Sequence, residues 1–347
     1  MKSIYSLTKK QLEDYFVSNN DKKFRAIQIF EWLYRKQVTS FDDMTNVNKQ
    51  TIQKLKEDFI INTIKIVKKQ EDKDVKKYLF ELNDGNKIET VLMYHDYGTS
   101  ICISSQIGCN MGCAFCESGR HKKLRNLTVD EMFLQVLEVQ KDIKERISHI
   151  VIMGIGEPFD NYENVMNFIN LVNDPYSLAI GSRHITVSTS GIVPKIYEFM
   201  KDTSQVNLAI SLHAPDNEIR NKIMKINKVY DIDEVIKAAK DYVNKTNRRI
   251  TFEYILLSDI NDSKECAIKL ANLIKDINCY VNLIPYNQTN NIGFKRSNNE
   301  KIQEFYDILK KNNINVTIRR EFGSNVSAAC GQLRSEESEW DIWKHFF

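Results

Sequence analysis

Residues 101–116 read ICISSQIGCNMGCAFC, a short apolar run that leads directly into three closely spaced cysteines. The run 101–105 has the β-branched composition of a buried strand. Cys109, Cys113 and Cys116 follow it with the spacing C-x3-C-x2-C. We therefore expect the cysteines on a loop at the carboxyl end of the first core strand, so this stretch fixes both the start of the core and the place of its chemistry.

The rest of the chain from about residue 100 onward repeats this rhythm, with apolar strand-like runs between amphipathic helical segments. The other strand candidates are His149–Met153, His184–Ser188, Val206–Leu212, Ile250–Leu257, Cys279–Ile284 and Val316–Arg319. Repeated β–α units with nearly continuous apolar strands predict an α/β fold with a parallel sheet and helices outside it. About six such units suit a full or partial (β/α) barrel, whose functional residues gather at the carboxyl ends of its strands.

Two segments of different character precede this core. Residues 1–60 read as a small helical domain, in which Thr8 and Gln11 fit a capping box, Asp21 could cap a second helix, and the spacing of apolar residues up to Phe59 suggests a third. Residues 61–99 change to a period of two and predict a β-hairpin extension with its turn at residues 83–86. We assign residues 100–347 to the barrel core.

Composition sets only broad limits on function. The 347 residues are 42% hydrophobic and 27% charged, with a net charge of +3, so the balance neither argues for RNA binding nor excludes it. No stretch approaches the roughly 20 apolar residues of a membrane span, and the N-terminus lacks an apolar signal core. We expect a cytoplasmic protein without a membrane partner. Clustered cysteines in a reducing compartment indicate metal binding or catalysis.

The cysteine spacing favours an iron–sulfur cluster. Three thiolates on one short loop can ligate three irons of a [4Fe–4S] cluster and leave the fourth iron open to chelate S-adenosylmethionine. A structural zinc site normally has four ligands, often as paired C-x2-C elements, and no second pair exists in this sequence. Chance clustering of buried cysteines is the remaining alternative.

In this context the chain resembles the RlmN/Cfr family of radical-SAM RNA adenine methyltransferases, over nearly its whole length. The matching blocks are residues 102–109, 154–158, 188–191, 211–215, 282–287 and 328–333. The resemblance implies a radical-SAM partial barrel, a [4Fe–4S] cluster held by the three loop cysteines, and S-adenosylmethionine. It also implies that residues 1–60 contact RNA.

The same resemblance suggests the cofactor contacts. Gly156 and Glu157 would hold the methionine end, because a glycine admits a ligand close to the backbone and a carboxylate accepts hydrogen bonds from an ammonium group. The other expected contacts, to ribose, carboxylate or adenine, are Ser188, Ser211, Leu212, His213 and Asn287. Taken singly, a serine at a strand end is more often a helix cap, and a lone histidine is more often a satisfied polar group.

Three further residues receive catalytic roles from the resemblance. Cys330 would be methylated by one S-adenosylmethionine, and a second would supply the radical that activates this methyl group, so two molecules are used per turnover. Cys102 would then release the product by forming a transient Cys102–Cys330 disulfide, with Glu89 as the base. Alone, Glu89 reads as a solvent-facing strand residue and the two cysteines as small buried hydrophobes.

RNA is the expected partner, together with an external electron donor and a thiol reductant, and we expect a monomer. The densest basic run is Arg120–Arg125, and Arg319 with Arg320 precedes the Cys330 loop; both could dock phosphates or simply be solvated surface. Several motifs look closer to RlmN than to Cfr, which implies methylation of adenine C2 in 23S rRNA and tRNA. Residues 117–121, 325–327 and Lys225 depart from the usual pattern.

Other functions stay open. A Cfr-type C8 methyltransferase is the nearest alternative, and a radical-SAM enzyme for protein or small molecules is another. A non-enzymatic iron–sulfur protein that binds RNA is the most distant, and it predicts no cleavage of S-adenosylmethionine on reduction.

Overall fold

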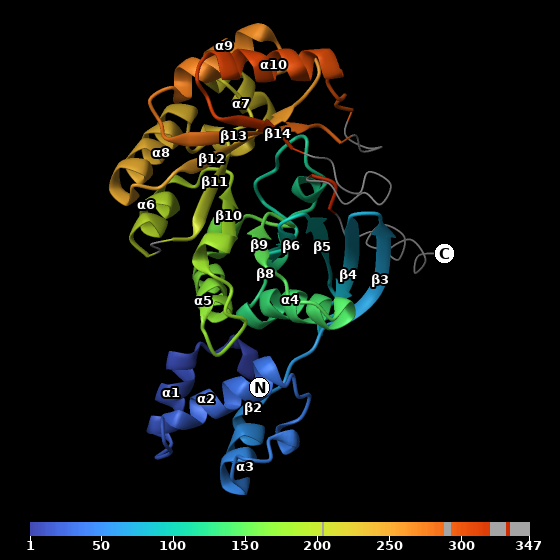
Figure 1. Cartoon of the computed structure of the whole chain (residues 1–347), viewed down its shortest axis with the longest axis vertical. Helices are drawn as coiled ribbons and strands as arrows, with labels where there is room; N and C mark the ends of the chain where they lie inside the picture. The colour runs from blue at the N-terminus through green and yellow to red at the C-terminus, as the bar shows by residue number, and fades with distance from the viewer. Residues whose placement is uncertain (203–204, 288–292, 320–330, 334–347) are drawn as a thin grey trace.

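A single ten-stranded sheet forms the centre of the molecule in the computed structural model, which describes residues 1–202, 205–287, 293–319 and 331–333 (Figure 1). The strand order is β14-β13-β12-β11-β10-β9-β6-β5-β4-β3. The edge strands β14 and β3 do not pair with each other, so the sheet is an open, partial barrel.

Seven neighbouring strands of this sheet are parallel, and they occupy the predicted strand positions to within a few residues. Their bounds are β6 Gly98–Ile103, β9 His149–Ile152, β10 Ile185–Thr189, β11 Asn207–Ser211, β12 Ile250–Leu256, β13 Cys279–Pro285 and β14 Val316–Ile318. Their alternate side chains face two sides, one packed under helices and one facing the barrel interior. The predicted α/β partial barrel is confirmed.

The predicted hairpin is present but belongs to a larger antiparallel extension. Strands β3 (Lys65–Asp72), β4 (Val75–Glu81) and β5 (Lys87–His95) pair antiparallel, and β5 pairs with β6. The extension therefore continues the barrel sheet without a break. Between β4 and β5 the chain reverses through Gly85, whose φ of +81° is a left-handed conformation that glycine adopts without strain.

Helices cover the outer side of the sheet, and a small helical unit lies beyond its lower end in Figure 1. The helices are α1 Lys9–Ser18, α2 Phe24–Phe30, α3 Lys49–Asp58, α4 Val129–Ile143, α5 Tyr162–Asn173, α6 Val193–Asp202, α7 Asn217–Ile223, α8 Ile232–Thr246, α9 Lys264–Ile274 and α10 Asn299–Lys311. The short strands are β1 Lys2–Ser3, β2 Phe59–Ile60, β7 Gln106–Ile107 and β8 Arg125–Asn126.

Two details of the N-terminal helices differ from prediction. The Thr8–Gln11 capping box forms, but Asp21 does not cap α2, whose N-cap is Lys23 without a side-chain hydrogen bond. Instead, the Asp21 carboxylate accepts hydrogen bonds from the Lys22 backbone and from the Thr51 hydroxyl on α3. Phe59 lies in β2 rather than in α3, because β2 pairs with β1 and brings the two ends of residues 1–60 together.

The N-terminal helices pack on the barrel through an aromatic contact. The Tyr5 ring stacks on Phe133 of α4 with centroids 5.3 Å apart, and the Tyr34 ring meets the same phenylalanine edge-on at 5.0 Å. Ser6 donates a hydrogen bond to Asp130 at 2.8 Å. Within the described part of the chain, no helix is both long enough and apolar enough to span a bilayer.

Candidate active site

A cavity opens at the carboxyl ends of the parallel strands, where functional residues of a barrel are expected. Eight of the predicted site residues line it: Cys109, Cys113, Cys116, Gly156, Glu157, Ser188, Ser211 and His213. They come from the loop after β6 and from the ends of β9, β10 and β11. Residues more than 100 positions apart in the sequence therefore share one site.

The cysteine loop is anchored on both sides. The Cys109 amide donates to the His121 carbonyl at 2.9 Å, and the Ala114 amide donates to the Ile223 carbonyl on α7 at 2.9 Å. Burial raises the pKa of the Cys109 thiol to about 12 and raises the pKa of the Cys113 thiol, so both are protonated unless a metal binds. Bound iron would deprotonate a coordinating thiol.

No group of three His, Cys, Asp or Glu side chains converges on a single ion in the part of the chain that the structure describes. Three thiolates that ligate three different irons of a cluster need not meet at one point.

The Glu157 carboxylate lines the cavity and is fixed in place by backbone hydrogen bonds. Its carboxylate is 3% exposed and accepts hydrogen bonds from the backbone amides of Phe159 at 3.0 Å and Ser190 at 2.8 Å. Burial nevertheless raises its pKa. Neighbouring Gly156 has a φ of +110°, and a Cβ atom there would lie 2.6 Å from the Cβ of Gln106, so the position requires glycine.

The His213 imidazole is neutral, with one ring nitrogen that accepts a hydrogen bond and one that can donate. Its Nδ1 accepts a hydrogen bond from the Ile255 amide at 3.0 Å, which leaves the proton on Nε2. Burial, and then the charge of Arg220, lower its pKa to about 3. Its φ of +58° is uncommon for a residue other than glycine, and such conformations cluster at functional sites.

Arg220 on α7 does not line the cavity but holds two of the strand ends that form it, and sequence reasoning missed it. Its guanidinium is fully buried and donates to the carbonyls of Ser190 at 2.6 Å and Leu212 at 3.2 Å, at the ends of two adjacent strands. It also donates to Asn227 at 2.8 Å. No motif marked it, because a helical arginine ordinarily faces solvent.

One buried polar atom that lines the cavity, Oε2 of Glu253, makes no hydrogen bond within the described structure. Leaving such an atom unpaired costs about 1–3 kcal/mol, which a polar ligand would recover. S-adenosylmethionine carries an ammonium, a carboxylate and ribose hydroxyls, so its groups fit this lining.

Glu89 and Cys102 lie on the inner face of neighbouring strands rather than in this cavity. Cys102 pairs in register with Val91 on β5, two residues from Glu89, so both side chains point to the same face. Glu89 is 1% exposed and forms an ion pair with Lys77 of β4 at 2.8 Å. The solvent-facing alternative for Glu89 is therefore wrong. Leu333 belongs to the same buried apolar cluster as Cys102.

The remaining predicted residues differ in their position relative to the cavity. Leu212 is fully buried, and Asn287 donates to the Pro285 carbonyl at 3.4 Å; neither lines the cavity. Cys330 and Arg320 lie outside the described residues, although Gly331, the next residue after Cys330, lines the cavity. Arg319 also lines it.

Comparisons with known proteins agree with this geometry. Residues 103–271 match the family model of the radical SAM superfamily, and residues 3–61 match that of the ribosomal RNA large subunit methyltransferase N-terminal domain. The crystal structure of a radical SAM methyltransferase from Sphaerobacter thermophilus superposes with a TM-score of 0.91 at 39% identity, covering 96% of this chain and 99% of that one.

Full-length relatives are closer still in sequence. A probable dual-specificity RNA methyltransferase RlmN from Enterococcus faecalis is 54% identical over 96% of both chains. Another with the same name, from Listeria monocytogenes, is 53% identical over 96% of this chain and 94% of its own. The cavity, the cysteine loop and these similarities show that this chain belongs to the RlmN family of radical SAM RNA methyltransferases.

Proposed function

We propose that this chain methylates carbon 2 of an adenine in 23S ribosomal RNA, and of an adenine in transfer RNA, in the cytoplasm and as a monomer. The observation that carries the proposal is the inner face shared by Glu89, Cys102 and Leu333, beside a cavity lined by the three loop cysteines. A base and a second thiol are not needed merely to generate a radical, but they are needed to finish a methyl transfer through Cys330. The names of the relatives support RNA as the substrate class.

When bound, the [4Fe–4S] cluster and S-adenosylmethionine would supply one-electron chemistry that a protein side chain cannot. The chain would hold the cluster through Cys109, Cys113 and Cys116, with the electron coming from an external donor. Glu157 would bind the ammonium group of S-adenosylmethionine, because its carboxylate is fixed by two backbone amides. His213 would donate from Nε2, and Ser188 and Ser211 would offer hydroxyls from strand ends.

The protein's own thiols and carboxylate would handle the methyl group and the proton. Cys330 would carry a methyl group taken from one S-adenosylmethionine, and a second molecule would be used to activate it. Glu89, whose carboxylate lies 2.8 Å from the Lys77 ammonium, would take the proton from the substituted adenine carbon. Cys102 would attack the sulfur of Cys330 to release the product, and a thiol reductant would restore both cysteines.

The three segments would divide the work. Residues 1–60 would contact RNA, residues 61–99 would present Glu89, and residues 100–347 would hold both cofactors and the Cys330 loop. Tyr78 illustrates why the middle segment suits its role: its hydroxyl donates to Asp142 of α4 at 2.8 Å, which fixes β4 to the barrel.

The deciding experiment is mass spectrometry of adenosines from RNA incubated with anaerobically reconstituted protein, reductant and S-adenosylmethionine. We expect 2-methyladenosine from both 23S ribosomal RNA and transfer RNA. Appearance of 8-methyladenosine instead would move the protein to the Cfr branch. Cofactor cleavage without any methylated adenosine would contradict the proposal.

Cysteine variants separate the two thiol roles. Cys330→Ala is expected to abolish product, whereas Cys102→Ala is expected to leave RNA covalently attached to the protein, visible as a shifted band on a denaturing gel. Cys266→Ala is the matched control, because Cys266 is a buried thiol on α9, outside the cavity. A Cys102→Ala protein that releases product normally would remove Cys102 from the mechanism.

A further inference from the structure

A second cavity lies beside the first, and the two share Ser118 in their walls. Ser118 and residues 331–333 lie between the two cavities. We call residues 331–333 the strap. The Ser118 hydroxyl donates to the Leu333 carbonyl at 2.8 Å, and the Glu117 amide donates to the Gly331 carbonyl at 2.9 Å. Gly331 lines the first cavity and Leu333 lines the second.

The second cavity has an apolar floor and a basic rim. Ile107, Ile155 and Leu333 are buried side chains of the floor, while Lys87 and the segment 120–122 bring cationic groups to the rim. No acidic side chain belongs to the lining among the residues that the structure describes. An apolar floor suits the face of a nucleobase, and a basic rim suits its phosphates.

The basic run that flanks the cysteine loop divides into two parts. Lys123 is paired with Asp160 at 2.6 Å, and Arg125 is paired with Asp84 at 2.6 Å and Glu131 at 2.7 Å. By contrast, Lys122 forms no ion pair within the described residues, and Arg120 has only a long contact of 3.5 Å with Glu117. Within this run, the two cations at the second cavity are therefore more weakly paired with carboxylates than Lys123 and Arg125 are.

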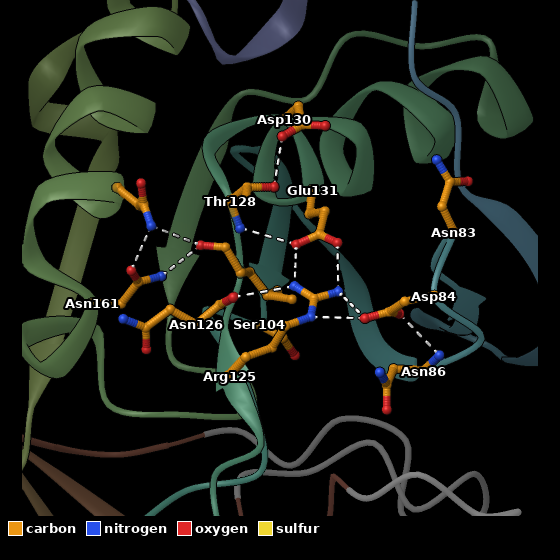
Figure 2. Close-up of polar contacts among 12 residues, drawn as sticks. Asn83, Asp84, Asn86, Ser104, Arg125, Asn126, Thr128, Asp130, Glu131 and Asn161 are labelled. Carbon is orange, nitrogen blue, oxygen red and sulfur yellow. Dashed lines mark hydrogen bonds and ion pairs between the residues drawn. The ribbon is translucent and has the colours of Figure 1, made fainter. Parts of the chain in front are cut away.

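The paired arginine fixes the walls of this cavity. Figure 2 shows Arg125 between Asp84, from the turn that joins β4 to β5, and Glu131, from the first turn of α4. Asp84 also accepts a hydrogen bond from the Asn86 amide at 3.1 Å, and Asn86 and Lys87 line the cavity. Arg125 lies on β8 and pairs in register with Ile107 of β7, which also lines the cavity, so the turn and this part of the floor are joined through one arginine before a ligand arrives.

We propose that the second cavity binds the RNA nucleotide that flanks the target adenine, with its base on the apolar floor and its phosphate between Arg120 and Lys122. The inference rests on the proposed function, because it takes RNA as the substrate. A base in this cavity is separated by the strap from the cavity that holds the loop cysteines. It is therefore placed as a neighbour of the reacting nucleotide, and not as the reacting nucleotide itself.

The test is the salt dependence of RNA binding, measured by fluorescence anisotropy with an unmodified transfer RNA transcript and no reductant, so that no turnover is needed. The double variant Arg120→Gln/Lys122→Gln is expected to bind about tenfold more weakly near 150 mM salt and to reduce the slope of log K against log[salt] by about 1, because both cations contact one phosphate. The control is Lys237→Gln/Lys264→Gln, which removes two exposed lysines from the outer helices α8 and α9 and is expected to match the wild type.

A second variant tests the base contact separately from the charge. Leu124 lines the cavity and is 70% exposed, so Leu124→Ser should fold normally, weaken binding about threefold and leave the salt slope unchanged. Ile268→Ser on α9, 48% exposed, is its control. Unchanged affinity in Leu124→Ser would overturn the base contact.

The outcomes separate this site from the proposed methylation. If the wild type methylates RNA and the double variant binds with wild-type affinity and slope, the site is wrong and the methylation stands. If no methylated adenosine forms but binding still depends on Arg120 and Lys122, the site stands and the methylation fails. A wild type that binds no RNA at all overturns the site.

Discussion

At the scale of single residues, Lys77 and Glu89 form a buried ion pair on the inner face of the sheet. Their side chains are 3% and 1% exposed and their charged atoms lie 2.8 Å apart. Removing one partner of a buried pair leaves an uncompensated charge, whereas removing both does not. The ion pair therefore stabilises the packing of β4 against β5 only while both side chains are present.

Lys77→Met is expected to lower the free energy of unfolding by about 3–5 kcal/mol, because Glu89 would then be buried without its cation. The double variant Lys77→Met/Glu89→Leu should recover most of this loss. Urea denaturation of the metal-free protein measures both, and equal losses in the single and double variants would show that the pairing is not what stabilises this face.

His213 gives a prediction with a definite pH sign. Its pKa is about 3 in the folded protein and about 6.5 in the unfolded chain, so between these values the unfolded chain binds the extra proton. Stability from this residue is therefore complete above pH 6.5 and falls as the pH drops, by about 1.4 kcal/mol per unit.

His213→Asn tests this effect and keeps the left-handed backbone, which asparagine tolerates. The stability of the wild type relative to this variant should fall by about 2 kcal/mol between pH 7 and pH 5. The readout is the difference in free energy of unfolding at the two pH values. A constant difference would mean that His213 has the same pKa in the folded and the unfolded protein.

At the scale of elements, the loops after the strands decide whether the cofactor site forms. Gly156 is the sharpest example, since its φ of +110° and the 2.6 Å approach of Gln106 exclude a side chain. Gly181 also lies in a connection, yet its φ is −59° and a Cβ atom added there would meet no heavy atom within 4 Å. The two glycines form a matched pair for substitution.

Gly156→Ala is expected to weaken binding of S-adenosylmethionine at least tenfold, because the loop carrying Glu157 must shift to admit a Cβ atom. Gly181→Ala should bind normally and be unchanged or slightly stabilised. Equilibrium dialysis with reconstituted protein gives both affinities. Normal binding by Gly156→Ala would show that this loop does not form the cofactor site.

The sequence predicted elements better than it predicted their partners. Periodicity placed all seven parallel strands, because a buried strand needs a continuous apolar run. It could not reveal that β3 joins the hairpin or that Asp21 bonds α3 instead of capping α2, since both depend on contacts between distant segments. Among site residues, motifs found Glu157 and His213, whereas Arg220 acts through backbone carbonyls on two strands that no local pattern can mark.

At the scale of the whole molecule, the N-terminal helices and the barrel share one continuous apolar core, in which Tyr5 and Tyr34 pack on Phe133. Deleting residues 1–60 would expose this ring and its neighbours on α4, so a truncated chain would lose stability as well as any RNA contact. Loss of activity in such a truncation would not identify which function the N-terminal helices serve.

Point variants separate the contribution of the N-terminal helices to stability from their contribution to RNA binding. Tyr5→Ala removes a buried ring, 2% exposed, and should cost about 3–5 kcal/mol of stability. Phe24→Ser changes an aromatic ring that is 47% exposed and lies beside Arg25, so it should leave the melting temperature nearly unchanged while weakening binding of a transfer RNA transcript about threefold. Thermal unfolding and anisotropy measured on the same preparations test both expectations. If Phe24→Ser binds RNA as the wild type does, this face of α2 is not an RNA contact, and the N-terminal helices act on the barrel through the Phe133 interface.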